Sequence, residues 1–483
     1  METKNQAGIT FVGLGSGDPE LLTRQAWNWL QGAAEIAVRA GADVEALATE
    51  QAKLLRLGEV GDASEEQMLT DLLDLARQPG GITYAAPGAP FEGDRLASLA
   101  RERAVQEGLA VYTIGGVSLF DAARGALGNA WAETAVHIDA HVLTGLHMPP
   151  FPPNLPALIV GIDGRDAASQ VVMALTGVYP ASTLLTRVAP GAKQGEAVAL
   201  EALDRQENYN SFAVWRVPAL GAGTALEDFQ EIVAALRAPN GCPWDREQTH
   251  LSLRTHLLEE TYEALEALDA QDVPGMVEEF GDLLLQIVLH AQIAAEAGEF
   301  HMADVVQGIN DKIIRRHPHV FGDVQVDGVT GVLQNWERLK AAERVDSPRK
   351  AKKKGLLDGV PPVFPSLAQA QEIQDRAARV NFDWLDIDGV IAKVNEELEE
   401  VKSAADEAAL TAEIGDLLFA VVNLARWEKV DAESALRETN ARFRRRFDHI
   451  EASALEKEIP LDEVGLDEMN RLWDEAKRQE KGE

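Results

Sequence analysis

A short acidic pattern occurs twice in this sequence, and it constrains the fold more than any other feature. Residues 259–263 read Glu-Glu-Thr-Tyr-Glu and residues 279–282 read Glu-Phe-Gly-Asp, and residues 396–400 and 413–416 repeat the same Glu-Glu-x-x-Glu and Glu-x-Gly-Asp. Glu260 and Glu397 are 137 positions apart, and Glu279 and Glu413 are 134 positions apart. This agreement predicts two copies of one structural unit.

Helical periodicity brings the acids of each copy together. Residues three apart lie on nearly one face of an α-helix, so each pattern places two carboxylates side by side. Pro274 and Gly275 separate the first two patterns, and a short break of this kind joins antiparallel helices. We expect four carboxylates to converge in each copy: Glu260, Glu263, Glu279 and Asp282 in the first, and Glu397, Glu400, Glu413 and Asp416 in the second.

These acids are predicted to lie beside apolar surface. The second helix of the first copy is apolar almost all round between Phe280 and Leu289, as a central buried helix would be. Uncompensated carboxylates there cost roughly several kcal/mol each, unless a cation balances them. Oxygen ligands without His or Cys favour Mg²⁺ or Mn²⁺ over zinc. A solvated acidic face explains one cluster equally well, but the matching duplication favours a metal site.

Charge and composition narrow the classes of partner. The formal net charge is −34, so nucleic acid and anionic membranes are not expected as partners. The single Cys242 fits a reducing compartment, residues 1–11 lack a signal-peptide pattern, and no uninterrupted apolar run reaches the roughly 18 residues that span a bilayer. We therefore expect a soluble, cytoplasmic protein. A length of 483 residues predicts two to four domains.

The first 222 residues alternate short apolar runs with amphipathic stretches. Predicted strands cover residues 9–14, 81–86, 110–114, 157–161 and 182–185, which is typical of an α/β domain with a largely parallel sheet. Gly13, Gly15 and Gly17 follow the first strand and precede a helix, where backbone amides can approach a ligand. Tight turns between a strand and a helix also need glycine for conformational reasons alone.

From Leu226 onward the period changes to that of helices, with segments at 229–236, 251–268, 274–297 and 302–316. A basic run at 344–355 is interpreted as a solvated linker rather than a nucleic-acid contact. The predicted organisation is an α/β domain at 1–222, an all-α domain at 223–345, a linker at 346–366 and a second all-α domain at 367–483.

Cations follow the acids in both copies. Residues 310–316 correspond to residues 440–446, and a Trp-x-x-x-Lys pattern comes later in each copy. A polyphosphate needs such groups, because a metal balances part of its charge while Arg and Lys hold the remaining oxygens. Pairing along an exposed helix is the alternative role for any single arginine. The candidates are Lys312, Arg316, Trp336 and Lys340 in the first copy, and Arg442, Arg446, Trp473 and Lys477 in the second.

Residues 8–220 resemble the tetrapyrrole methylase family. The resemblance rests on the turn at residues 13–19, on Gly88-Ala89-Pro90 where the family has Gly-Asp-Pro, and on residues 115–118, Gly-Gly-Val-Ser, where it has Pro-Gly-Val-Ser. It implies two α/β lobes with S-adenosylmethionine bound between them. Gly13, Gly15 and Gly17 would then belong to the cofactor turn.

Residues 225–483 resemble the MazG nucleoside triphosphate pyrophosphohydrolases. The resemblance rests on residues 240–245 (Asn-Gly-Cys-Pro-Trp-Asp), on residues 315–321 (Arg-Arg-His-Pro-His-Val-Phe) and on both acidic sets, and the fusion to a methylase-like domain resembles the YabN type. It implies a dimeric, all-α, Mg²⁺-dependent enzyme that cleaves NTPs or dNTPs to a nucleoside monophosphate and pyrophosphate. The eight acids would be its metal ligands, and Lys393, Arg442, Arg446, Trp473 and Lys477 would contact substrate.

The acid before each motif, Glu259 or Glu396, is predicted to orient or deprotonate the attacking water. Pro318 ends the basic helix of the first copy, so we expect the second copy to be the main catalyst. Two alternatives stay open at this point. One is an S-adenosylmethionine-dependent methyltransferase with a helical appendage for dimerisation, and the other is a regulatory protein that binds nucleotides without turnover.

Overall fold

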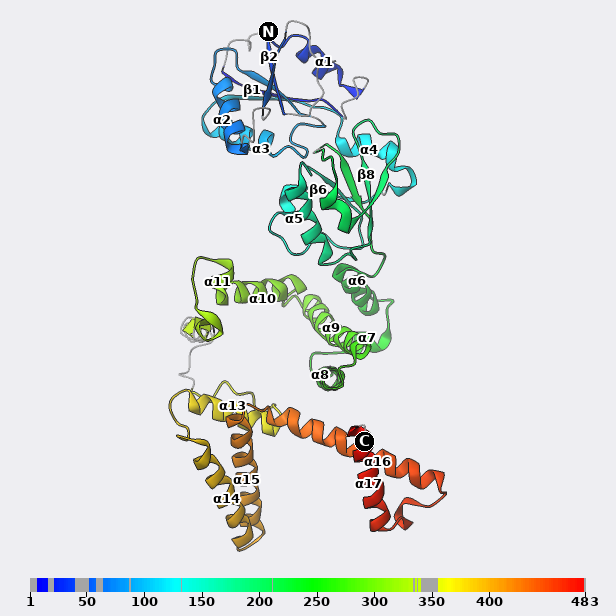
Figure 1. Ribbon diagram of the computed structural model, residues 1–483, viewed down its shortest axis with the longest axis vertical. Coiled ribbons are helices and arrows are strands. Elements are labelled where there is room, and N and C mark those ends of the chain that lie inside the picture. Colours follow the sequence, from blue (N-terminus) through cyan, green and yellow to red (C-terminus); the bar gives the residue numbers. More distant parts are fainter. Residues whose placement is uncertain are drawn as a thin grey trace. The chain divides into compact units, whose positions relative to one another are not determined.

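The computed structural model describes residues 7–15, 21–39, 52–57, 64–86, 88–131, 133–210, 212–332, 335–336, 338–339 and 355–481. The chain divides into two compact units, residues 1–248 and residues 249–483. Figure 1 shows strands and helices in the first unit and helices in the second. An α/β region followed by a helical region was predicted, and this order is confirmed. The four-part division stays a prediction.

The first sheet of unit 1 is parallel in all its described pairings. Its order is β3-β2-β4-β1-β5, so β1 lies between β4 and β5, and it is buried along its length. Residues of β1 contribute to a separate apolar core on each face, Phe11 to one and Val12 to the other. The strands are β1 (Gly8–Gly13), β2 (Glu35–Arg39), β3 (Lys53–Leu57), β4 (Ile82–Ala86) and β5 (Ala110–Ile114), and the helices are α1 (Arg24–Leu30), α2 (Glu65–Ala76), α3 (Arg95–Gln106) and α4 (Leu119–Leu127).

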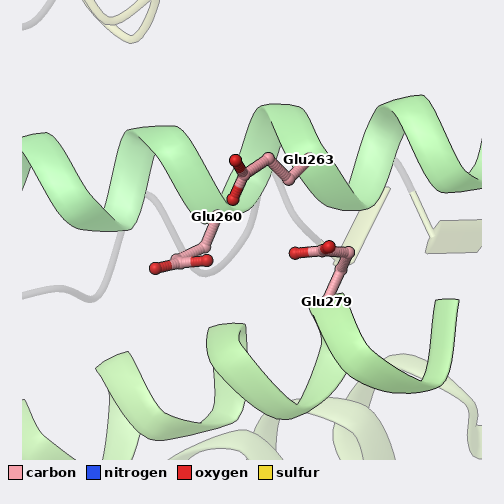
Figure 2. A group of neighbouring side chains, drawn as sticks. All are labelled: Glu260, Glu263 and Glu279. Carbon is pink, nitrogen blue, oxygen red and sulfur yellow. The ribbon is translucent and has the colours of Figure 1, made fainter. Parts of the chain in front are cut away.

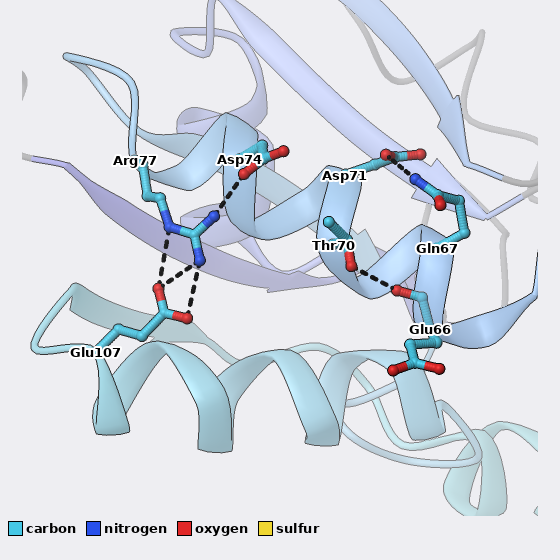
Figure 3. Close-up of polar contacts among 7 residues, drawn as sticks. All are labelled: Glu66, Gln67, Thr70, Asp71, Asp74, Arg77 and Glu107. Atoms are coloured by element: carbon cyan, nitrogen blue, oxygen red, sulfur yellow. Dashed lines mark hydrogen bonds and ion pairs between the residues drawn. The ribbon is translucent and has the colours of Figure 1, made fainter.

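A charged contact links two helices of this half. Arg77, directly after α2, donates hydrogen bonds to both carboxylate oxygens of Glu107 after α3, and it also contacts Asp74. Figure 3 shows this contact at one end of α2 and a second set of polar contacts, around Thr70, further along the helix. Arg77 therefore fixes the C-terminal ends of α2 and α3 beside each other.

The second sheet, in the order β6-β7-β10-β8-β9, is mixed. Only β6 and β7 pair in parallel; β7 with β10, β10 with β8 and β8 with β9 are antiparallel. The prediction of a largely parallel sheet is therefore wrong for this half, because β8 and β9 follow each other as a hairpin and short connections allow only antiparallel pairing. The elements are β6 (Val136–Asp139), β7 (Ala157–Val160), α5 (Arg165–Thr176), β8 (Leu184–Val188), β9 (Glu196–Ala199) and β10 (Val214–Val217).

Two further helices, α6 and α7, form the C-terminal end of unit 1, and the described part of unit 2 is helical. Asp386, Asp406 and Asp431 begin α14, α15 and α16 by accepting hydrogen bonds from backbone amides of the first turn. The helices are α6 (Leu226–Arg237), α7 (Pro243–Glu247), α8 (Arg254–Asp269), α9 (Val273–Glu296), α10 (Met302–Arg316), α11 (Pro318–Phe321), α13 (Ser366–Ala378), α14 (Ile387–Ser403), α15 (Glu407–Trp427), α16 (Ala432–Glu456) and α17 (Leu466–Lys481). All four predicted helical segments are confirmed. Residues 344–354 of the predicted basic run lie outside the described residues.

The expectation that α9 is buried on all sides is wrong for the single chain. The sequence predicted a helix buried all round, but Phe280 and Ile287 are 48% and 45% exposed, whereas Val288 and Leu289 are buried. The chain packs α8 and α10 against α9, and these neighbours leave one apolar side uncovered. In the second copy α15 is similar, with Leu418 53% exposed.

Among the described residues, α15 is the one helix that is long and apolar enough to cross a membrane, with a mean hydropathy of 1.6. Length and composition alone are weak evidence for a membrane span, and this helix also carries Glu413 and Asp416. An apolar helix with one uncovered side is equally consistent with a protein–protein contact.

Candidate functional site

The first acidic cluster lies between α8 and α9, which a three-residue connection joins into an antiparallel pair. Glu260, Glu263 and Glu279 each offer a carboxylate oxygen within 4.8 Å of the other two. Figure 2 shows Glu260 and Glu263 reaching from one helix toward Glu279 on the other. The i,i+3 spacing therefore does bring these acids together.

The second cluster repeats this arrangement between α14 and α15. Glu397, Glu400 and Glu413 offer carboxylate oxygens within the same 4.8 Å limit. Glu397 is only 4% exposed, and its Oε2 has no hydrogen-bond partner among the residues that the structure describes. A buried carboxylate oxygen without a partner is costly, so this cluster has the chemistry of a cation site.

Crowding of negative charge contributes to a raised pKa for three of these acids. Partial desolvation, together with the charges of Asp282, Glu263 and Glu279, raises the pKa of Glu260. Desolvation and neighbouring acids also raise the pKa of Glu279, and desolvation with the charges of Glu397 and Glu413 raises that of Glu400. A bound cation would relieve this repulsion.

The fourth predicted ligand of each copy stands apart from the three-residue clusters. Asp282 is half-buried and its charge acts on both Glu260 and Glu279. Asp416 is exposed. The structure thus places three predicted ligands of each copy together, and a metal role for Asp282 and Asp416 stays a prediction.

Each acid that precedes a cluster has a cationic or titratable partner one turn earlier. Nζ of Lys393 lies 2.9 Å from Glu396 and 2.7 Å from Glu397, while Nδ1 of His256 lies 3.2 Å from Glu259. His256 and Lys393 are 137 positions apart, so they occupy the same place in the repeat. The sequence singled out Lys393 but not His256, although the repeat spacing identifies both.

The predicted substrate contacts of the second copy lie on α16 and α17. Arg446 donates to Oε2 of Glu480 at 2.6 Å and lies over the ring of Trp473, while Arg442 contacts Glu438 and Thr439. Arg446 is about 21 Å along α16 from its first residue, at 1.5 Å per residue. In the described part of the chain, neither arginine contacts a carboxylate of the α14–α15 cluster. Lys477 is exposed on α17.

The first copy repeats the arginine–tryptophan contact. The guanidinium of Arg316 lies 5.3 Å from the ring centre of Trp336, as that of Arg446 lies 5.5 Å from Trp473. Lys312, one helical turn before Arg316, is half-buried on α10. Lys340 lies outside the described residues.

Gly13 and Gly15, two of the three glycines predicted to bind a cofactor, pack against other turns of unit 1. A Cβ added at Gly13 would lie 2.5 Å from the amide nitrogen of Gly116, and Gly15 exchanges backbone hydrogen bonds with Gly88. The amide of Gly15 is therefore engaged by the chain itself, and Gly17 lies outside the described residues. A cofactor role for this turn stays a prediction.

Unit 1 also contains a polar cavity of about 490 Å³ where its two sheet-containing halves meet. Arg39, Arg95, Asp139, His141 and Asp163 contribute to its lining, and Arg39 pairs with Asp163 at 3.2 Å. None of these side chains stood out in the sequence, because single residues scattered between positions 39 and 163 form no pattern.

Comparison with known proteins identifies two families in the chain. The model for the MazG nucleotide pyrophosphohydrolase domain matches residues 248–321 and 387–451, and these ranges include both acidic clusters. The model for tetrapyrrole (corrin/porphyrin) methylases matches residues 8–159.

One relative matches the whole chain, and others match about half of it over nearly their full length. The chain is 37% identical to YabN of Bacillus subtilis, a protein described as uncharacterised, over 98% of this chain and 99% of that protein. It is 45% identical to the nucleoside triphosphate pyrophosphohydrolase/pyrophosphatase MazG of Thermotoga maritima, over 53% of this chain and 97% of that protein. It is 44% identical to the nucleoside triphosphate pyrophosphohydrolase of Escherichia coli K12, over 52% of this chain and 95% of that protein.

Proposed function

Because the chain belongs to the MazG nucleotide pyrophosphohydrolase family, with a tetrapyrrole methylase domain preceding the MazG region, we propose that it hydrolyses nucleoside triphosphates. The products are a nucleoside monophosphate and pyrophosphate, formed by attack of water at the α-phosphorus. The observation that carries this proposal is the pair of three-carboxylate clusters on equivalent helices.

The residues present fit a hard divalent cation. Glu260, Glu263 and Glu279, with Asp282, would hold Mg²⁺ or Mn²⁺ in the first copy, and Glu397, Glu400 and Glu413, with Asp416, would do so in the second. The unpartnered Oε2 of Glu397 and the raised pKa values of Glu260, Glu279 and Glu400 support this assignment. When bound, such an ion makes a water more acidic and balances charge on phosphate oxygens.

The remaining steps fall to side chains of the protein. Glu396, placed by its bond to Lys393, orients the attacking water or accepts its proton, and Glu259 does the same beside His256. Lys393, Arg442, Arg446 and Lys477 bind phosphate oxygens and stabilise the departing pyrophosphate. Lys312, Arg316 and Lys340 have this role in the first copy. Trp473 and Trp336 contact the nucleoside.

The proposed active form is a homodimer. The exposed apolar sides of α9 and α15 can be buried in an interface, and a second copy of this chain presents the same apolar surface for that contact. A partner subunit would also allow cations on α16 and α17 to approach an acidic cluster that they do not contact in their own chain. The proposed setting is the cytoplasm, without nucleic-acid or membrane partners.

Single substitutions test the proposal in each copy. Glu400→Gln and Glu263→Gln each remove one charge from a cluster, and pyrophosphate release with Mg²⁺ is measured for both. We expect each to lower activity and Glu400→Gln to lower it more. Glu399→Gln is the matched control, because this exposed acid pairs with Lys402 and lies outside the cluster. Unchanged pyrophosphate release in both cluster variants would remove the proposal.

A second candidate function is methyl transfer from S-adenosylmethionine in unit 1. The family match over residues 8–159 favours it, together with the polar cavity, whose acidic side chains Asp139 and Asp163 are suited to ribose hydroxyls or to a sulfonium charge. Calorimetric titration of the full chain with S-adenosylmethionine tests it. Absence of binding leaves a structural or regulatory role for this domain.

A further inference from the structure

Outside the acidic clusters, two histidines from different parts of unit 2 share a hydrogen bond. Nδ1 of His250, in the turn that precedes α8, lies 2.8 Å from Nδ1 of His290 on α9. The two residues are 40 positions apart, so the bond ties the entrance of α8 to the body of α9. These are the helices that carry Glu260, Glu263 and Glu279.

The geometry of this pair favours a shared proton over a metal ion. The ring planes differ by 8°, and the ring centres are 5.0 Å apart. This separation is close to the sum of the Nδ1–Nδ1 distance and the two ring radii, which is the value for two rings placed end to end. The rings therefore lie nearly end to end in one plane, with the two Nδ1 atoms facing each other. A ring nitrogen directs its hydrogen or its lone pair in the ring plane, so one N–H points at one lone pair. An ion has no room between nitrogens at this distance.

Only one proton fits in that space. The bond forms when one Nδ1 carries hydrogen and the other does not, whether the pair is neutral or singly charged. When both rings are charged, both Nδ1 atoms carry hydrogen and repel each other. In the described part of the chain, the carboxylate of Glu299 lies 4.0 Å from Nε2 of His250. It is therefore on the side of that ring that faces away from His290. Burial and the charge of His250 lower the pKa of His290. This direction agrees with a pair in which binding of a second proton is unfavourable.

The second copy supplies an internal comparison. The repeat offsets of 137 and 134 positions place Ile387 and Leu424 where the first copy has His250 and His290. Neither side chain titrates. Acidification can therefore act on the α8–α9 pair by this route and cannot act on the α14–α15 pair.

We propose that His250 and His290 form a proton-operated clasp on the α8–α9 pair, closed at neutral pH and opened by the second proton in the acidic range of histidine. The first acidic cluster then has a pH-dependent control through these histidines that the second cluster lacks, a consequence that rests on the proposed hydrolase function.

Hydrogen exchange of the full chain tests the clasp without depending on catalysis. Amide protection is compared between α8–α9 and α14–α15 from pH 7.5 to pH 5, so that the intrinsic effect of pH on exchange cancels. We expect α8–α9 to lose about fivefold more protection, the size of one net hydrogen bond. The double variant His250→Ile, His290→Leu, which installs the residues of the second copy, should remove this difference. An equal loss of amide protection in both helix pairs of the wild type would overturn the clasp.

A second measurement covers the case in which the double variant does not fold. The ¹⁵N shifts of the histidine rings in the wild type should identify one protonated and one unprotonated Nδ1 at neutral pH, unchanged by EDTA. Two unprotonated Nδ1 atoms would contradict the clasp, and a signal that depends on EDTA would identify a metal site in its place. Pyrophosphate release is measured on the same samples: a working clasp without release refutes only the hydrolase, and release without the pH-dependent difference in exchange refutes only the clasp.

Discussion

Nζ of Lys393 lies 2.7 Å from Oε1 of Glu397, so the most buried carboxylate of the second cluster faces a lysine of its own helix. The hydrogen bonds from Lys393 to Glu397 and Glu396 raise the pKa of the lysine, which keeps it charged. The other oxygen of Glu397 has no hydrogen-bond partner in the described part of the chain. The cluster is therefore only partly balanced by the chain itself.

Replacing this lysine should make the protein depend on added cation. We predict that Lys393→Met lowers the melting temperature in EDTA, because Glu397 loses its cationic partner, and that saturating Mg²⁺ restores most of the loss. Thermal unfolding with and without Mg²⁺ measures both effects. Lys402→Met is the control, since this lysine pairs with the exposed Glu399 at 2.7 Å. An equal response of both variants to Mg²⁺ would argue against a cation site at Glu397.

The acidic clusters should destabilise the metal-free protein at neutral pH. The pKa of Glu400 is raised, mainly by desolvation, so between its folded pKa and the ordinary carboxyl value of about 4.3 the folded state binds more protons than the unfolded state. Stability from this group therefore increases as the pH falls. We predict that Glu400→Gln is more stable than the wild type in EDTA at pH 7.5, and that the difference narrows toward pH 5. Chemical denaturation at both pH values measures it, and a difference that widens on acidification would be the wrong sign.

The uncovered side of α15 should hold the dimer together. Leu418→Asp places a charge among exposed apolar residues of that helix, so we predict dissociation to monomers, measured by light scattering after size-exclusion chromatography. Leu455→Asp, at an 80% exposed position on α16, is the control and should leave the assembly intact. A wild-type protein that is monomeric at all concentrations would contradict this assignment.

Glu480 should compete with substrate for Arg446. Its carboxylate accepts two hydrogen bonds from that arginine, and these bonds lower the pKa of Glu480. We predict that Glu480→Gln lowers KM for the nucleoside triphosphate and leaves kcat nearly unchanged, because the arginine becomes available for ground-state binding. Glu475→Gln, which affects only the neighbouring pair with Arg471, should change neither. A raised KM with a lower melting temperature would instead assign Glu480 to holding α17 on α16.

The parts of this structure that local spacing determines were predictable from sequence. Acids three apart on a helix, followed by a short connection, place Glu260 and Glu263 opposite Glu279 wherever the two helices pack. The same reasoning applied to Glu397, Glu400 and Glu413, which also lie together, and their role as metal ligands stays a prediction.

Features that depend on long-range packing were not predictable. The strands β2, β3, β6, β9 and β10 were missed, and the antiparallel pairing of β10 with β7 and β8 has no local signal. The apolar run of α9 predicted burial, but hydrophobicity does not reveal whether a cover comes from the same chain or from another. The contact between His250 and His290 joins single residues 40 positions apart, a distance at which one sequence contains no pattern.

The most direct test of the central claim is pyrophosphate release from a nucleoside triphosphate by the full chain, measured with Mg²⁺, with EDTA, and for the double variant Glu263→Gln, Glu400→Gln with Mg²⁺. We predict stoichiometric formation of nucleoside monophosphate and pyrophosphate with Mg²⁺, and loss of at least about 100-fold in rate in the other two samples, as for removal of major electrostatic stabilisation of a transition state. Release that continues in EDTA or in the double variant, or cleavage that yields phosphate and a nucleoside diphosphate instead, would contradict the account.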